Sequence, residues 1–381
     1  MSLLGLPFLV LLCAVGVALP LAVGLSWTRW PGRLAFPGRL VSLLLVMLLG
    51  AAVGGTLLNR SFGFYASFRD LLAISAQSYD PPASFGEVKS QARLVVLTKH
   101  WQQHGISQAR AGHGVLLAVT FGGPRSGISR NGLLYLPAAY SSSPSDVALP
   151  VVELLHGYPG RPGNFSDQLS ISRVLDTEIA ARRMPPVIAA IPTTYSHRAS
   201  ECVDAVNGER NETYLAVDVP ADVEAAFRVL SGRSFAAAGY SEGGFCAVNL
   251  GLHHPDRFSG AASLSGYFIA ATEAGTRPLY RGSRGALQRN SPLWWVGHRK
   301  PTGPALFLTA SADDRFAEQQ ILQLRAAARQ HAPKLPIVAT LSPGGGHNFG
   351  TWNEALPAAL DFLGRELPMP LAPPIRLPTM P

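Results

Sequence analysis

One serine in the chain has the surroundings of a nucleophile. Gly239-Tyr240-Ser241-Glu242-Gly243 matches the pattern G-x-S-x-G and stands between an apolar run at residues 235–238 and an apolar helical pattern at 245–252. A strand, a tight turn flanked by glycines and a helix are the context in which this pattern presents a serine hydroxyl at a helix N-terminus. Glycine makes up 38 of the 381 residues, so the pentapeptide alone can arise by chance. Its context favours a nucleophilic Ser241.

Two side chains that follow the serine have the chemistry to activate it. Asp313 and Asp314 come shortly after an apolar run at residues 305–309, and His347 stands behind three glycines after a run that ends at residue 341. Attack by a serine hydroxyl needs a base that takes its proton and a carboxylate that orients this base. We predict that His347 is the base and Asp314 the acid, because Asp314 lies nearer the helix that follows. Asp313 would then be solvated or cap this helix.

The negative oxygen that forms during acyl transfer needs two fixed hydrogen-bond donors. The backbone N–H of Glu242, the residue after the serine, is the first candidate. The second comes from the loop at residues 156–160, where Pro159 has no N–H and Tyr158 is therefore the candidate donor. His156 in the same loop precedes the serine, and we interpret it as a structural histidine.

Composition argues against several classes of function. The net charge is +8, but no run of Lys and Arg is interleaved with aromatic residues, so nucleic-acid binding is not predicted. No C-x-x-C or H-E-x-x-H spacing occurs, which argues against a metal site, and His253-His254-Pro255 is interpreted as the end of a helix. Cys202 and Cys246 could form a disulfide in an oxidising compartment or be two unrelated buried thiols.

Two apolar segments near the N-terminus predict a membrane anchor. Residues 3–25 and 40–58 are each close to the roughly 20 residues that span a bilayer as a helix. The connection between them contains Arg29, Arg33 and Arg39, and positive charge favours the cytoplasmic side. We therefore expect a hairpin in the cell membrane with both ends outside and an extracytoplasmic catalytic domain. A signal peptide cleaved at either segment is the alternative.

The chain divides into four predicted regions. Residues 1–59 form the transmembrane hairpin, and residues 60–114 form a juxtamembrane connector that is partly helical or packs on the domain. Residues 115–367 form the catalytic domain, and the Pro-rich residues 368–381 form a disordered tail.

Short apolar runs alternate with helical patterns from residue 115 onwards. Alternation of this kind predicts an α/β fold, a mostly parallel sheet with helices on both faces, here with an antiparallel start. The predicted strands are residues 115–121, 132–136, 150–155, 186–191, 235–238, 260–264, 305–309 and 336–341. The predicted helices are residues 167–181, 218–230, 245–253, 315–331 and 352–365.

A set of segments in this order resembles the esterase D family, which includes carboxylesterases, S-formylglutathione hydrolases and the secreted mycolyltransferases. They are His156-Gly157-Tyr158-Pro159-Gly160, residues 212–220, 239–244, 254–258 and 264–268. The resemblance covers residues 115–367 and implies an α/β-hydrolase fold, a triad of Ser241, Asp314 and His347, and no cofactor. The cysteines at 202 and 246 are also similar to those of exported members. Where mycolyltransferases carry a Trp-containing segment, this chain has residues 161–165, which argues against mycolyl transfer in particular.

Substrate binding is predicted around the long connection at residues 268–304. We expect it to form a cap whose Trp294 and Trp295 line an acyl groove; the alternative is that both tryptophans fill a small local core. Tyr267, just before this connection, is a further candidate for substrate binding. Residues 195–209 could form a second wall of the site.

Three classes of function agree with these features. The first is a serine ester hydrolase that acts on acyl esters through an acyl-enzyme. The second is an acyltransferase that moves the acyl group onto an envelope sugar or lipid alcohol, and the third is a non-catalytic binding protein of the same fold. A membrane anchor makes an envelope lipid or an exported ester the expected substrate class.

Overall fold

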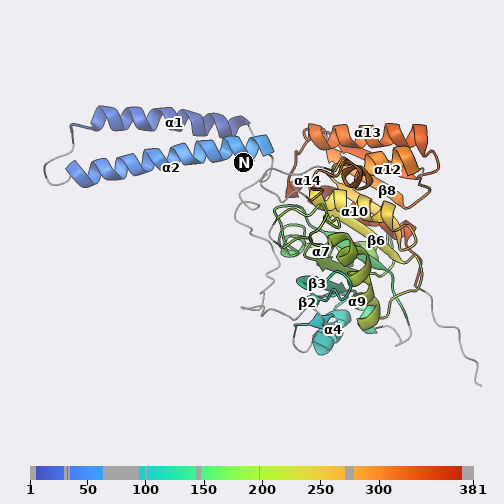
Figure 1. The fold of residues 1–381 in the computed structure, drawn as a ribbon. Coiled ribbons are helices and arrows are strands. Elements are labelled where there is room, and N and C mark those ends of the chain that lie inside the picture. Colours follow the sequence, from blue (N-terminus) through green and yellow to red (C-terminus); the bar gives the residue numbers. More distant parts are fainter. Residues whose placement is uncertain are drawn as a thin grey trace, which may run out of the picture.

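The computed structural model describes residues 6–29, 32, 35–62, 94–98, 101–142, 147–196, 198–270, 279–299 and 301–370. Two long apolar helices, α1 (Leu6–Ser26) and α2 (Ala35–Phe62), form a hairpin that stands apart from an α/β domain in Figure 1. Within them, Pro7–Ser26 has a mean hydropathy of 2.7 and Ala35–Leu57 one of 2.3, and both are long and apolar enough to cross a membrane. These segments agree closely with the predicted spans.

A single sheet organises the domain. Within the described residues it has nine strands in the order β1-β2-β3-β5-β4-β6-β7-β8-β9. Strands β1 to β3 pair antiparallel, β3 also pairs antiparallel with β5, and the remaining neighbours are parallel. The strands are β1 (Val95–Val96), β2 (Val115–Phe121), β3 (Arg130–Leu136), β4 (Val151–Leu155), β5 (Ile188–Pro192), β6 (Phe235–Tyr240), β7 (Phe258–Leu264), β8 (Ala305–Ser311) and β9 (Ile337–Ser342).

Helices cover both faces of this sheet. The inner strands are apolar at nearly every position, as expected for a parallel sheet that is buried on both sides. One face packs on α9 (Val219–Ala226), α10 (Glu242–His253), α12 (Pro292–Arg299) and α13 (Arg315–His331), and the other on α7 (Ile171–Ala180) and α14 (Phe349–Glu366). The smaller helices are α4 (Trp101–Arg110), α5 (Ala138–Ser142), α6 (Gly163–Asp167), α8 (Asn211–Thr213) and α11 (Arg284–Arg289), with a π-helical turn at Tyr214–Asp218. The predicted α/β-hydrolase fold with its mostly parallel sheet is confirmed.

The sheet begins earlier than the predicted domain start at residue 115. Val95 and Val96 form β1, which pairs with β2, and α4 packs on β2. Part of the predicted connector therefore packs on the domain, where β1 covers backbone groups that β2 would otherwise leave exposed at a sheet edge. The rest of the connector, residues 63–93 and 99–100, lies outside the described residues, and so does most of the predicted tail.

Two predicted helices differ in the structure. The helix expected at residues 167–181 begins later, as α7 at Ile171, because Ser170 adopts a left-handed conformation with φ 47° that separates it from α6. The helix expected at residues 218–230 starts earlier with the π-helical turn at Tyr214–Asp218 and ends with α9 at Ala226.

Candidate active site

The predicted nucleophile stands on a sharp turn between β6 and α10. Ser241 has φ 55° and ψ −124°, a backbone conformation that L residues rarely adopt and that surrounding contacts must hold in place. Gly243 is required here, because a Cβ on it would lie 1.9 Å from the carbonyl oxygen of Leu155 in β4. A Cβ on Gly239 would lie 2.2 Å from the carbonyl oxygen of Gly243. Close contact between strands and helix therefore explains the two glycines of the motif.

The structure brings Ser241, His347 and Asp314 together at the carboxyl edge of the sheet. Ser241 Oγ lies 2.9 Å from His347 Nε2, and His347 Nδ1 lies 2.6 Å from Asp314 Oδ2. The carboxylate accepts a hydrogen bond from Nδ1–H, which leaves Nε2 without a proton and able to accept a hydrogen bond from the serine hydroxyl. Asp313 has a different partner, because its Oδ2 accepts the N–H of Gly345 at 3.2 Å. Of the two neighbouring carboxylates, Asp314 is therefore the one that contacts the imidazole.

Each of the two activating residues is held by its own element. Asp314 also caps α13, since its second oxygen accepts the N–H of Ala317 at 3.2 Å. The sequence predicts that Asp313 is solvated or caps this helix, whereas in the structure Asp314 both contacts the imidazole and caps the helix. The loop before His347 turns at Gly345 and Gly346, which have φ 127° and 76°, and the N–H of Gly346 donates to Ser311 Oγ at 3.0 Å. These bonds fix the loop on the end of β8.

The loop that follows β4 lies directly against the serine. A Cβ on Gly157 would be 3.0 Å from Ser241 Cβ, so a side chain here would push the loop and the serine apart by a few tenths of an ångström. Tyr158 is the next residue, and its ring contacts that of Tyr195 with centroids 4.9 Å apart. Glu242 follows the serine as the first residue of α10. Both predicted donors therefore flank Ser241.

His156, in the same loop, is fully buried and has two partners. Its Nδ1 donates to the carbonyl oxygen of Gly157 at 2.9 Å, and its Nε2 accepts the N–H of Thr194 at 3.1 Å. A neutral ring satisfies both bonds. Burial lowers the pKa of His156 to about 4, from an ordinary value of 6.5. These contacts agree with a structural histidine.

The buried His156 should make the fold sensitive to mild acid. Its pKa is lowered in the folded state, so the unfolded chain binds more protons between pH 6.5 and about 4, and stability falls as the pH drops through this window. We expect a loss of roughly 3 kcal/mol in the free energy of unfolding, measured by urea denaturation of the detergent-solubilised chain. His156→Asn lacks the titrating ring and should respond less over this window. If the free energies of unfolding of the two proteins fell equally with pH, the lowered pKa of His156 would not be the cause of the acid sensitivity.

Cys202 and Cys246 form a disulfide, the first of the two alternatives that the sequence left open. It joins the segment after β5 to the second turn of α10. The sequence predicts only that this segment could form a second wall of the substrate site. It does not predict the contacts of Tyr195 and Glu201, because no motif marks these residues.

The predicted substrate-binding residues have different environments. Tyr267 lies beyond the end of β7, near the serine; its ring stacks on Phe245 with centroids 4.8 Å apart, and its hydroxyl donates to Glu201 at 3.0 Å. Its ring centroid is 6.4 Å from that of Phe316, whose side chain is 62% exposed.

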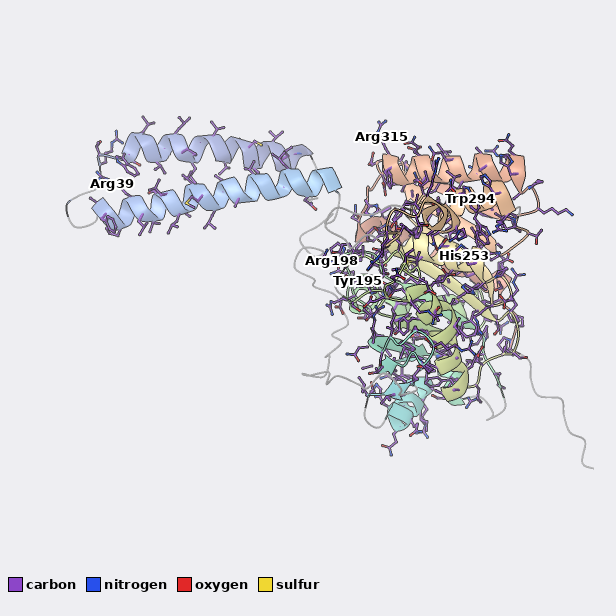
Figure 2. All side chains as sticks on the ribbon, in the orientation of Figure 1. Arg39, Tyr195, Arg198, His253, Trp294 and Arg315 are labelled. Atoms are coloured by element: carbon purple, nitrogen blue, oxygen red, sulfur yellow. A yellow bond between two sulfur atoms is a disulfide. The ribbon has the colours of Figure 1, made fainter. Side chains whose placement is uncertain are left out.

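The prediction that Trp294 and Trp295 line a groove at the serine is wrong. Trp295 packs on His253, with ring centroids 4.4 Å apart, at the C-terminal end of α10. This end lies roughly 17 Å along the helix from the end that carries Ser241. Trp294 stacks on His298 of its own helix, and Figure 2 shows Trp294 and His253 on one side of the domain and Tyr195 on the other. Trp295 therefore belongs to the packing of α12 on α10, and Trp294 packs within α12 itself.

The two histidines at the end of α10 bind one carboxylate. His253 Nδ1 and His254 Nε2 lie 3.0 and 2.9 Å from the same oxygen of Glu212. Burial raises the pKa of Glu212, but the hydrogen bonds from both histidines outweigh this effect and lower it to about 2. No cluster of three or more His, Cys, Asp or Glu suited to a metal ion occurs within the described part of the chain.

Known proteins share this architecture. A ferulic acid esterase is similar with a TM-score of 0.59 and 22% identity, over 66% of this chain and 98% of its own. An S-formylglutathione hydrolase from Agrobacterium tumefaciens is similar with a TM-score of 0.58 and 15% identity, over 67% of this chain and 96% of its own. Identities at this level establish a common fold.

Sequence comparison goes further than the fold. An uncharacterised protein of Corynebacterium glutamicum is 28% identical over 248 residues, which are 62% of this chain and 57% of that relative. Residues 124–363 match the sequence model of the family described as "Putative esterase". The match covers more than half of the chain, which therefore belongs to this esterase family.

Proposed function

We propose that the protein is a serine ester hydrolase in which Ser241, His347 and Asp314 are the catalytic residues. The observation that carries this proposal is the continuous hydrogen-bonded chain from Asp314 through His347 to Ser241, with contacts of 2.6 and 2.9 Å. The convergence of three residues from separate loops argues against the alternative of a non-catalytic binding protein.

The mechanism follows from the geometry. His347 Nε2 takes the proton of Ser241 while Oγ attacks the ester carbonyl, and Asp314 stabilises the imidazolium that forms. The backbone N–H groups of Tyr158 and Glu242 stabilise the negative oxygen. Collapse of the tetrahedral intermediate breaks the ester C–O bond, and His347 protonates the departing alcohol. Water then attacks the acyl-enzyme with His347 as base, which releases the acid and restores Ser241.

An acyltransferase is the second candidate, because two apolar helices precede the domain. We propose that they anchor it in the membrane with Arg29 and Arg39 on the cytoplasmic side. The disulfide between Cys202 and Cys246 supports an oxidising, extracytoplasmic location. Protease added to intact spheroplasts tests this orientation: an extracytoplasmic domain should be digested, and a domain that stays intact would contradict the proposal.

An anchored active site would face envelope lipids and their alcohol groups. These alcohols would compete with water for the acyl-enzyme, which is why transfer is considered beside hydrolysis.

One assay tests the function and separates the two candidates. The full-length protein in detergent is given p-nitrophenyl esters of increasing acyl length, with and without glycerol, and both free acid and glyceryl ester are measured. A hydrolase releases mainly acid in the presence of glycerol, whereas a transferase forms mainly the glyceryl ester. Absence of p-nitrophenol release for every acyl length would refute both.

A further inference from the structure

A segment after β5 connects the two parts of the chain that flank Ser241. We call residues 194–196 and 198–202, the described residues of this stretch, the clamp segment. On one side it contacts the loop at residues 156–160, which contains the proposed donor Tyr158. On the other side it contacts the first two turns of α10, where Glu242 provides the second proposed donor.

The contacts of the clamp segment with the loop are polar and specific. The N–H of Thr194 donates to His156 Nε2 at 3.1 Å, and the opposite ring nitrogen donates to the carbonyl oxygen of Gly157 at 2.9 Å. The hydroxyl of Tyr195 accepts the N–H of Gly160 at 2.7 Å and donates to the carbonyl oxygen of the same residue at 2.6 Å. The clamp segment therefore holds the loop both before and after Tyr158.

The contacts with α10 involve a buried carboxylate. Glu242 is 5% exposed, and its Oε1 accepts the N–H groups of Ser200 at 3.0 Å and Glu201 at 2.7 Å. The next residue, Cys202, is joined by the disulfide to Cys246, about one helical turn beyond Glu242. Hydrogen bonds therefore fix the clamp segment to Glu242, the residue that follows Ser241. The disulfide fixes it to the next turn of the same helix.

The two ends of the clamp segment are also joined to each other. Ser200 Oγ donates to the carbonyl oxygen of Thr194 at 2.8 Å and accepts the N–H of Cys202 at 3.1 Å. A displacement at one end is therefore passed to the other. The carboxylate of Glu201 accepts the hydroxyl of Tyr267 at 3.0 Å and that of Tyr280 at 2.6 Å, which fixes the turn against β7 and the chain beyond it.

Two features set this segment apart from ordinary core packing. Glu201 and Cys202 have φ of 45° and 52°, which is strained for L residues and persists only where the surroundings hold it; such strain is concentrated at functional sites. A buried carboxylate such as that of Glu242 is costly unless it is hydrogen-bonded. An apolar side chain would fill the same space more cheaply but could not hold the two N–H groups.

We propose that the clamp segment sets the spacing between the two oxyanion donors, with Glu242 Oε1 as the positioning contact on the helix side and the Tyr195 hydroxyl on the loop side. This inference rests on the proposed function. Donors stabilise the transition state only when they lie within about 2.7–3.1 Å of the developing oxyanion. A change in their spacing should therefore lower kcat and leave KM almost unchanged, because the ground state does not depend on these bonds to the same extent.

A matched pair of variants at Glu242 tests the helix side. Glu242→Gln keeps a carbonyl oxygen for both N–H groups and should retain kcat within about threefold, whereas Glu242→Leu has a similar size and no acceptor. We expect Glu242→Leu to lower kcat by about ten- to a hundredfold, part of the loss that follows removal of a whole donor. The inhibition constant of an alkylboronic acid, which forms a tetrahedral adduct on the serine, should rise by the same factor as kcat/KM falls.

Tyr195→Phe tests the loop side and keeps the inference testable if Glu242→Leu does not fold. It should lower kcat and weaken boronic acid binding in the same way. Its control is Tyr135→Phe, which removes the hydroxyl of a buried tyrosine that is bonded to Asp176 at 2.6 Å and lies outside the clamp segment. This control should lower the melting temperature and leave kcat unchanged.

The outcomes separate this inference from the proposed function. A folded Glu242→Leu or Tyr195→Phe with kcat within twofold of wild type overturns the inference, as does a rise in KM alone or a fall in kcat with unchanged boronic acid affinity. The hydrolase itself would still stand in each of these cases. A wild-type protein that neither hydrolyses esters nor binds the boronic acid overturns the proposed function, and the clamp inference with it.

Discussion

Ser241→Ala should lower the turnover of a p-nitrophenyl ester by about a million-fold, the loss expected when the nucleophile of a serine triad is removed. The reason is that His347 would have no hydroxyl to activate and no acyl-enzyme could form. Turnover of the purified full-length protein, together with mass spectrometry after treatment with a fluorophosphonate, measures both the rate and the site of labelling. In the wild type, the label should be found on the peptide that contains Ser241.

Ser265→Ala is the matched control for this experiment. Ser265 is buried, whereas Ser241 is partly buried; like Ser241 it has a positive φ, 53°, and it lies at the end of the neighbouring strand β7. It has no place in the proposed mechanism, so the variant should keep its labelling and most of its turnover. Labelling that survives in Ser241→Ala, or is lost only in Ser265→Ala, would show that the nucleophile is misassigned.

Asp314→Asn should lower kcat by about ten-thousand-fold, as the same change does in other serine triads. An amide in this place no longer selects the tautomer that has its proton on Nδ1, and it stabilises the imidazolium less. Asparagine remains a good helix cap, so the bond to the N–H of Ala317 and the fold should be preserved. The measurement is kcat together with the melting temperature.

Asp313→Asn separates the two neighbouring carboxylates. Asp313 contacts the N–H of Gly345 and not the imidazole, and asparagine can accept the same bond. We expect kcat within a fewfold of wild type. Equal losses in Asp313→Asn and Asp314→Asn would mean that the acid acts through the loop and not through direct contact with His347.

The parts of the site that local sequence could reveal are those built from short motifs. The turn around Ser241 needs glycines because the helix and β4 approach each other closely. These glycines lie within two residues of the serine, so a short sequence motif is enough to recognise the turn. His347 and Asp314 follow strand ends, and a parallel sheet brings such positions to one edge. Their order along the chain was therefore enough to find the residues that meet at the serine.

Contacts between segments that lie far apart in the sequence could not be predicted from local motifs. The hydrogen bonds between Tyr195 and Gly160 and between Ser200 and Glu242 depend on the path of the loop after β5. The sequence of this loop has no helical or strand periodicity that would predict its path. Trp294 and Trp295 were assigned to a groove from the length of their connection alone, whereas the packing of α12 against α10 decides where they lie. The disulfide stayed open for the same reason, since the 5.4 Å between the Cα atoms of Cys202 and Cys246 is a property of the fold.

The spacing of the site along the chain has a consequence for biosynthesis. Ser241 and His347 are 106 residues apart, and β7, β8 and β9 all lie between them. A nascent polypeptide that has emerged only as far as β7 contains the hydroxyl but neither the imidazole nor the carboxylate. In the proposed mechanism, Ser241 therefore has no base while the chain is being made, and it gains one only when β8, β9 and the loop that contains His347 have been added to the domain.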